Sequence, residues 1–104
     1  MGKKRAKEIE DFVKGIKNAY SPSLILLFGS RARNNNLRES DYDILIVSEE
    51  FSGTQWVRRH EDAYQYWKGN LHLDLLCYSP EEFEKKKKQI GIVQRALKEG
   101  IVLG

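Results

Sequence analysis

Cysteine and long apolar runs are scarce in this chain. Cys77 is the single cysteine among 104 residues, so no disulfide can form within the chain. No apolar run approaches the ~20 residues of a membrane-spanning helix. The basic N-terminus, residues 1–7, is not followed by the apolar segment of a signal peptide. We therefore expect a cytoplasmic protein that has no membrane partner.

Internal repeats and low-complexity linkers are also absent from the sequence. A chain of 104 residues with 40% hydrophobic and 32% charged residues suits one globular domain with a modest core, over residues 1–104. The net charge of +3 would suit an anionic ligand or an acidic partner, but it is too small to predict direct nucleic-acid binding. For the basic runs at residues 3–7 and 85–88, a solvated surface is the simpler interpretation.

Three segments carry helical signals. Residues 4–19 have one apolar stripe at helical spacing, made of Ile9, Phe12, Val13, Ile16 and Ala19. Thr54 is a candidate N-cap for a helix that runs to about residue 67. Its expected apolar face consists of Trp56, Val57, Ala63, Tyr64 and Trp67. Ser79-Pro80 has the features of a helix start, and the last helix should turn four residues inward: Ile92, Val93, Ala96 and Leu97.

Short apolar runs predict strands over residues 24–28, 41–47, 71–77 and 101–103. In the third strand, alternation places His72 and Asp74 on one face and the apolar residues on the other. The resulting order is α-β-(short α)-β-α-β-α-α-β. It predicts an α/β (α+β) fold, in which helices pack on a small mixed sheet of three to four strands.

Two acids dominate the chemistry of the second strand. Asp41 and Asp43 are two residues apart, so their side chains share one face, with Cα atoms ~6–7 Å apart. Carboxylates that close repel each other unless a cation lies between them. Oxygen ligands suit Mg²⁺, and a pair of metal ions can clamp both oxygens of a phosphoryl transfer. We therefore expect a site for Mg²⁺, most simply for two ions.

The end of the first strand supplies a second element of the site. Gly29 lets the backbone approach a ligand closely, and the Ser30 hydroxyl and nearby N–H groups can bind phosphate. Arg31 and Arg33 could add positive charge near a triphosphate, although arginines after a turn are often only surface residues. Asp74 is the best candidate for a third metal ligand, because a carboxylate in an apolar strand needs a cation or solvent.

These residues resemble the signature of the DNA polymerase β nucleotidyltransferase superfamily. The signature is an apolar residue before Gly29-Ser30, ten residues, and then Asp41-Tyr42-Asp43 followed by an apolar residue. The string from Gly29 to Arg33 and the end of the chain, residues 96–103, are similar to the minimal nucleotidyltransferases. The likeness covers nearly the whole chain and implies a polymerase β palm-like fold.

The resemblance also implies roles for the site. Asp41 and Asp43 would hold both metal ions and Asp74 the catalytic one, so that all three are catalytic and metal-binding residues. Five residues would bind the nucleotide, with ATP as the substrate: Gly29, Ser30, Arg31, Arg33 and Ser40. The implied reaction moves AMP from ATP to a tyrosine of a helical HEPN-domain toxin, with this chain as the antitoxin.

Two other functions fit the sequence. The chain could bind a nucleotide without transferring it and inhibit its partner by masking, although the intact acids weigh against an inactive site. It could also modify small molecules, as the enzymes that adenylate antibiotics do, but these usually have an extra helical domain for the acceptor.

Overall fold

The computed structural model of the protein describes residues 7–28, 42–69 and 72–104. Its elements follow the predicted order, with one 3-10 helix that was not predicted, and the expected turn at residues 31–33 lies outside the described residues. They are α1 (Lys7–Tyr20), β1 (Leu24–Phe28), β2 (Tyr42–Val47), the 3-10 helix η1 (Glu49–Phe51), α2 (Trp56–Tyr64), β3 (Leu73–Tyr78), α3 (Pro80–Lys87), α4 (Ile92–Glu99) and β4 (Ile101–Val102). No helix in this part of the chain is long and apolar enough to cross a membrane.

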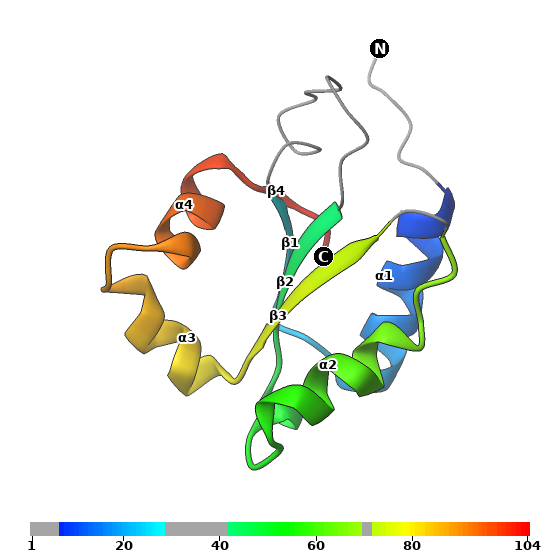
Figure 1. Cartoon of the computed structure of the whole chain (residues 1–104), viewed down its shortest axis with the longest axis horizontal. Helices are drawn as coiled ribbons and strands as arrows, with labels where there is room; N and C mark the ends of the chain where they lie inside the picture. Colours follow the sequence, from blue (N-terminus) through cyan, green and yellow to red (C-terminus); the bar gives the residue numbers. More distant parts are fainter. Residues whose placement is uncertain (1–6, 29–41, 70–71) are drawn as a thin grey trace.

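The four strands form one mixed sheet in the order β3-β2-β1-β4 (Figure 1). β1 is antiparallel to both β2 and β4, whereas β2 and β3 are parallel. Parallel neighbours need a crossover connection, and α2 supplies it. This arrangement confirms the predicted α/β class and the mixed sheet.

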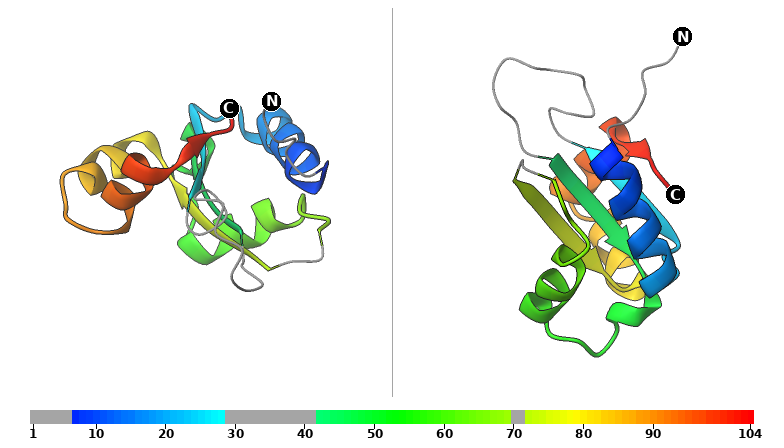
Figure 2. Two further views of the ribbon diagram at one scale, coloured as in Figure 1. Left: turned by 90° about the horizontal axis from the view of Figure 1, so that it is seen from above. Right: turned by 90° about the vertical axis from the view of Figure 1, so that its right-hand side faces the viewer.

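Helices cover both faces of the sheet. Figure 2 shows α1 and α2 on one side and α3 and α4 on the other. Alternating strand residues feed two cores, so Ile44 and Leu75 join the α1 side while Leu45 and Tyr78 join the α3 side. Burial on both faces explains why the strands are continuous apolar runs.

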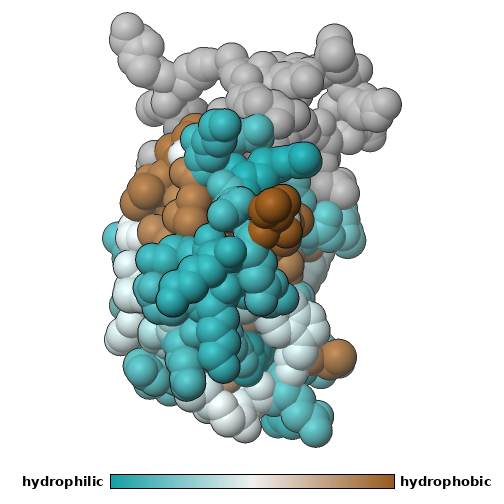
Figure 3. Space-filling model, turned by 90° about the vertical axis from the view of Figure 1, so that its left-hand side faces the viewer, coloured by the Kyte–Doolittle hydropathy of each residue, from teal (hydrophilic) through white to brown (hydrophobic). Residues whose placement is uncertain are grey.

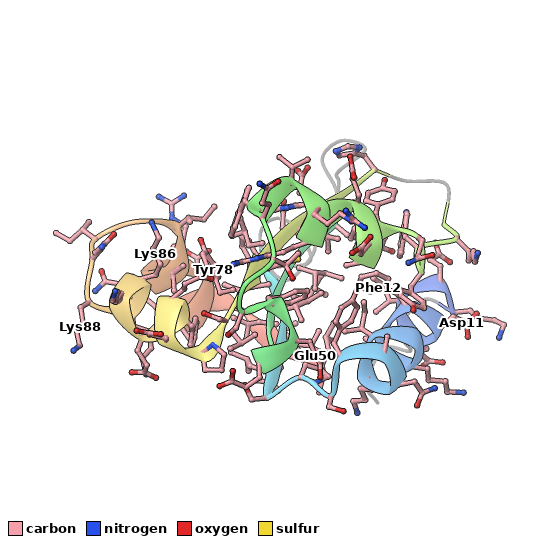
Figure 4. The ribbon with its side chains drawn as sticks, turned by 90° about the horizontal axis from the view of Figure 1, so that it is seen from below. Asp11, Phe12, Glu50, Tyr78, Lys86 and Lys88 are labelled. Atoms are coloured by element: carbon pink, nitrogen blue, oxygen red, sulfur yellow. The ribbon has the colours of Figure 1, made fainter. Side chains whose placement is uncertain are left out.

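Helix α1 packs through the stripe that the sequence predicts. Ile9, Phe12, Val13 and Ile16 are buried, whereas Ala19 is exposed, because the stripe runs off the sheet at the last turn. Figure 4 shows Phe12 pointing into the molecule and Asp11 pointing away from it.

The glycine within this helix has a packing role. A Cβ at Gly15 would lie 2.8 Å from Cδ1 of Tyr66, which is too close for unstrained contact. Glycine costs helix stability, but here it lets the Tyr66 ring lie directly against the helix.

The prediction for α2 was wrong in its cap and its length, and its inward face was right only for Ala63 and for Trp67, which is buried just beyond the helix. Gln55, not Thr54, precedes the helix, and the helix ends at Tyr64. Trp56, Val57 and Tyr64 are exposed, and the buried residues of the helix are Arg59 and Ala63. Sequence periodicity failed because it treats an arginine as a surface residue, whereas this helix turns its arginine inward.

Arg59 is buried because every part of its guanidinium group has a partner. Its Nη1 and Nη2 donate to the two carboxylate oxygens of Glu82, at 2.6 and 3.0 Å. Nη1 also donates to the Cys77 carbonyl at 3.0 Å, and Nε donates to the Thr54 carbonyl at 2.8 Å. A buried charge is tolerated when it is paired in this way. The side chain therefore links α2, the end of β3 and the start of α3.

The start of α3 matches its prediction. The Ser79 hydroxyl accepts from the Glu82 amide at 3.2 Å, and Glu82 Oε1 accepts from the Ser79 amide at 2.9 Å, with Pro80 in the first turn. This is a capping box. Glu82 thus belongs both to the cap and to the ion pair with Arg59.

The last helix is only partly as predicted. Val93 and Ala96 are buried, but Ile92 and Leu97 are exposed, at 52% and 40% of their surface. Helix α4 is short, and its contact with β1 covers only one narrow stripe of its surface.

We expect Glu82→Gln to destabilise the protein at neutral pH by roughly 2–3 kcal/mol, because it leaves the buried Arg59 charge unpaired. The hydrogen bonds from Arg59 lower the pKa of Glu82 from 4.5 to about 2. A carboxyl whose pKa is lowered by folding stabilises the protein above pH 4.5, and this stabilisation is lost as the pH falls towards 2. Urea unfolding across this range should show a shallower acid slope for the variant.

The matched control is Glu81→Gln, since Glu81 is an exposed neighbour on the same helix. Equal stabilities of the two variants at neutral pH would contradict the role given to Glu82.

Candidate active site

Two of the three predicted metal ligands, Asp43 and Asp74, lie within the described residues. Asp41 lies outside them, as do all five predicted nucleotide-binding residues: Gly29, Ser30, Arg31, Arg33 and Ser40. The site can therefore be built from the ends of the strands that hold Asp43 and Asp74.

The strand register brings the two acids together. Asp43 of β2 pairs with Asp74 of β3, and on its other side it pairs with Phe28, the last residue of β1. Register partners on neighbouring strands point to the same face of a sheet. Two residues 31 positions apart in the sequence are thus direct neighbours at one end of the sheet.

The acids lie on the face of the sheet that α3 and α4 cover. Asp43 alternates with Tyr42 and Ile44, which point to the α1 side, and it shares a face with Leu45, a member of the core under α3 and α4. Asp43 is half-buried, and the side chain of Asp74 is 57% exposed. The helices therefore bury the far end of this face and leave the acids at its accessible end.

His72 is the third polar side chain at this end. Its Nε2 lies 2.9 Å from Oδ1 of Asp74, and both side chains are more than half exposed. The contact follows from the alternation of the strand, since residues two apart share a face. We predicted this shared face from the sequence, and the distance is that of a hydrogen bond.

The residues present suit a hard cation. Asp43 and Asp74 offer carboxylate oxygens on one face, which is the donor set that Mg²⁺ prefers. Within residues 7–28, 42–69 and 72–104, no three His, Cys, Asp or Glu side chains form a group that could hold a metal ion. The third predicted ligand, Asp41, is the residue directly before this segment of β2.

Cysteine chemistry is not available at the site. Cys77 is fully buried on the α1 side of the sheet, opposite to the acids. Burial raises the pKa of its thiol to about 12, so the reactive thiolate is not formed at neutral pH. Cys77 is a core residue, and the described chemistry at this end of the sheet is that of the carboxylates.

Solved structures of other proteins share the fold. A candidate nucleotidyltransferase from Sulfolobus solfataricus superposes with a TM-score of 0.64 over 98% of this chain and 89% of that one, at 21% identity. BolA1 from Arabidopsis thaliana superposes with a TM-score of 0.60 over 75% of this chain and 98% of that one, at 18% identity. At such identities the likeness concerns the fold alone.

A closer relative in sequence covers less of the chain. A Methanocaldococcus jannaschii protein, named as a candidate protein adenylyltransferase, is 47% identical over 45 residues. The matched segment covers 41% of this chain and 45% of that protein, so less than half of the relative's length is matched.

Residues 7–102 match the family described as the nucleotidyltransferase domain. The match includes both acids, the sheet that aligns them and all four α-helices. The chain therefore belongs to the nucleotidyltransferase domain family, whose chemistry is nucleotide transfer.

Proposed function

We propose that the protein is a Mg²⁺-dependent adenylyltransferase that moves AMP from ATP to a tyrosine of a protein. The observation that carries this proposal is the alignment of Asp43 with Asp74 at the accessible end of the sheet, in a chain of the nucleotidyltransferase family. The name of the archaeal relative, a candidate protein adenylyltransferase, favours a protein as the acceptor.

The likeness to minimal nucleotidyltransferases favours a HEPN-domain toxin as that protein, with this chain as its antitoxin. Masking of the toxin without transfer is the alternative. The two differ in whether the toxin gains a nucleotide.

The proposed reaction exchanges one bond at the α-phosphorus of ATP for another. The tyrosine oxygen bonds to the α-phosphorus of ATP, the bond from that phosphorus to the bridging oxygen breaks, and pyrophosphate leaves with the electron pair. The tyrosine proton passes to the Asp74 carboxylate.

Asp41, Asp43 and Asp74 would hold the metal ions, and Gly29 and Ser30 would hold the triphosphate. Bound Mg²⁺ would neutralise charge on the phosphates. The contribution of the chain itself is positioning, because strand pairing fixes Asp43 beside Asp74 before any ligand arrives.

ATP should bind tightly only when Mg²⁺ is present, because aligned carboxylates repel a triphosphate unless a cation lies between them. Calorimetric titration of ATP, with Mg²⁺ and with excess chelator, measures the difference. Asp74→Asn should remove most of the metal-dependent affinity, and Asp11→Asn, on the exposed face of α1, should leave it intact. Equal ATP affinity in chelator and in Mg²⁺ would rule out the metal site.

Asp43→Asn should reduce transfer by at least about a hundredfold, a loss typical of removing one charge-stabilising group. The melting temperature of the metal-free variant should hold or rise, because paired carboxylates on neighbouring strands repel each other. Intact-mass spectrometry of a HEPN-domain partner incubated with ATP and Mg²⁺ detects the added AMP.

A clear fall in the melting temperature would mean that Asp43 is structural. Inhibition of the partner without added mass would replace transfer by masking.

His72→Ala should weaken metal binding by about tenfold, the lower end of the range for residues that orient a ligating carboxylate. Both side chains of the pair are exposed, so a larger effect is not expected. Binding of Mn²⁺, followed by electron paramagnetic resonance, measures this without any reaction. Unchanged Mn²⁺ affinity would show that His72 does not position Asp74.

A further inference from the structure

Basic side chains outnumber acidic ones along the last turn of α3, the turn that follows it and α4. Residues 85–99 contain one acidic side chain, Glu99, and six basic ones: Lys85, Lys86, Lys87, Lys88, Arg95 and Lys98. Lys87 is used locally, since it pairs with Glu84 at 3.0 Å and lies over the Phe83 ring. Lys88 points away from the body of the molecule (Figure 4).

Two exposed isoleucines lie among these basic residues. Ile90 is 96% exposed and Ile92 is 52% exposed. A single exposed apolar residue needs no explanation, but two beside one groove mark a contact site. Figure 3 shows this face, where apolar residues interrupt a mainly hydrophilic surface.

The isoleucines border a groove along α4. Its volume is about 520 Å³, and it is lined by Ile90, Gly91, Ile92, Gln94, Arg95, Lys98 and Glu99. We call this lining the α4 groove. It combines two isoleucines with two cations and one acid, so its net charge is positive, and protein-binding surfaces also combine apolar residues with polar ones.

The α4 groove lies near the acids. Ile101, which begins β4 just after α4, pairs with Leu27 of β1. The next residue of β1 is Phe28, which pairs with Asp43, the partner of Asp74. Helix α4 thus ends at the acid-bearing end of the sheet and on the side that the acids face (Figure 1).

We propose that the α4 groove binds an acidic amphipathic helix of the protein that accepts the nucleotide. Apolar side chains of that helix contact Ile90 and Ile92, and its carboxylates pair with Arg95 and Lys98. A protein held there has its acceptor hydroxyl beside Asp43 and Asp74. The docking surface deepens the proposed function and rests on it only for this last step.

Charge and shape favour this occupant over others. A second copy of the chain would bring cations against cations. A nucleic acid would satisfy the lysines but gives exposed isoleucines no apolar partner. An anionic bilayer would suit lysines beside isoleucines, but it has no side chain to fill a groove.

The test uses the full chain and three synthetic helical peptides. The probe peptide has glutamates, leucines on one face and one tyrosine. One control replaces the glutamates by lysines, and the other replaces the leucines by serines. Fluorescence anisotropy measures binding at two salt concentrations, with anionic vesicles and single-stranded RNA as competitors.

The probe peptide should bind more tightly than either control. Ile90→Ser with Ile92→Ser, and separately Arg95→Glu with Lys98→Glu, should each weaken binding by about tenfold or more. Lys14→Glu with Lys17→Glu, on exposed positions of α1, makes the same charge change on the opposite side of the sheet and should have a much smaller effect. Melting temperatures establish that each variant is folded.

Two results would overturn the proposal. One is equal weakening by the α1 and α4 charge variants, which would mean general attraction to anions. The other is displacement of the peptide by vesicles or RNA at lower concentration than unlabelled peptide, which would assign the groove to a membrane or to a nucleic acid. If the Asp43→Asn variant binds the probe peptide as tightly as the wild type does, docking at the groove does not depend on the acids of the active site. If transfer to the peptide tyrosine fails in the wild type while binding persists, the proposed function fails and the docking surface stands.

Discussion

The register of β2 against β3 is the constraint on which the chemistry of this protein depends. Parallel pairing sets Asp43 directly beside Asp74, so the backbone itself holds two like charges together. A shift of one residue would turn Asp74 into the α1 core and leave Asp43 beside an apolar residue. The pair lies at an accessible end of the sheet, where a cation can reach it. A site prepared in this way needs little rearrangement when its ligand binds.

The partners of β3 maintain that register. As an edge strand, β3 would expose unpaired carbonyls, but side chains of α2 cover it: Arg59 donates to the Cys77 carbonyl, and His60 Nε2 lies 2.5 Å from the Leu75 carbonyl. Arg59 also holds Glu82, and through Glu82 the start of α3. One buried guanidinium therefore connects the strand that carries Asp74 to α2 on one face of the sheet and to α3 on the other.

Most of the strands and the first helix could be predicted from the sequence, because the strands are short apolar runs and the helix has an apolar stripe at helical spacing. The alternation of residues 71–77 correctly placed Asp74 on the face opposite to Leu73, Leu75 and Cys77. The failure in α2 has a physical cause, which is that periodicity counts apolar residues and ignores the partners of polar ones. Arg59 is buried since Glu82 and two carbonyls satisfy it, whereas Trp56 of the same helix is 42% exposed. The pairing of Asp43 with Asp74 was also beyond the sequence, because strand order and register depend on the whole fold.

A crystal structure of the chain with Mn²⁺ and a non-hydrolysable ATP analogue would show whether Asp43 and Asp74 bind metal together. The anomalous signal of Mn²⁺ locates the metal without reference to any assumed ligand. We expect Mn²⁺ at coordination distance from carboxylate oxygens of both Asp43 and Asp74, with the triphosphate over the end of β1. Metal and nucleotide bound elsewhere, with these two carboxylates contacting only solvent or protein, would contradict this expectation.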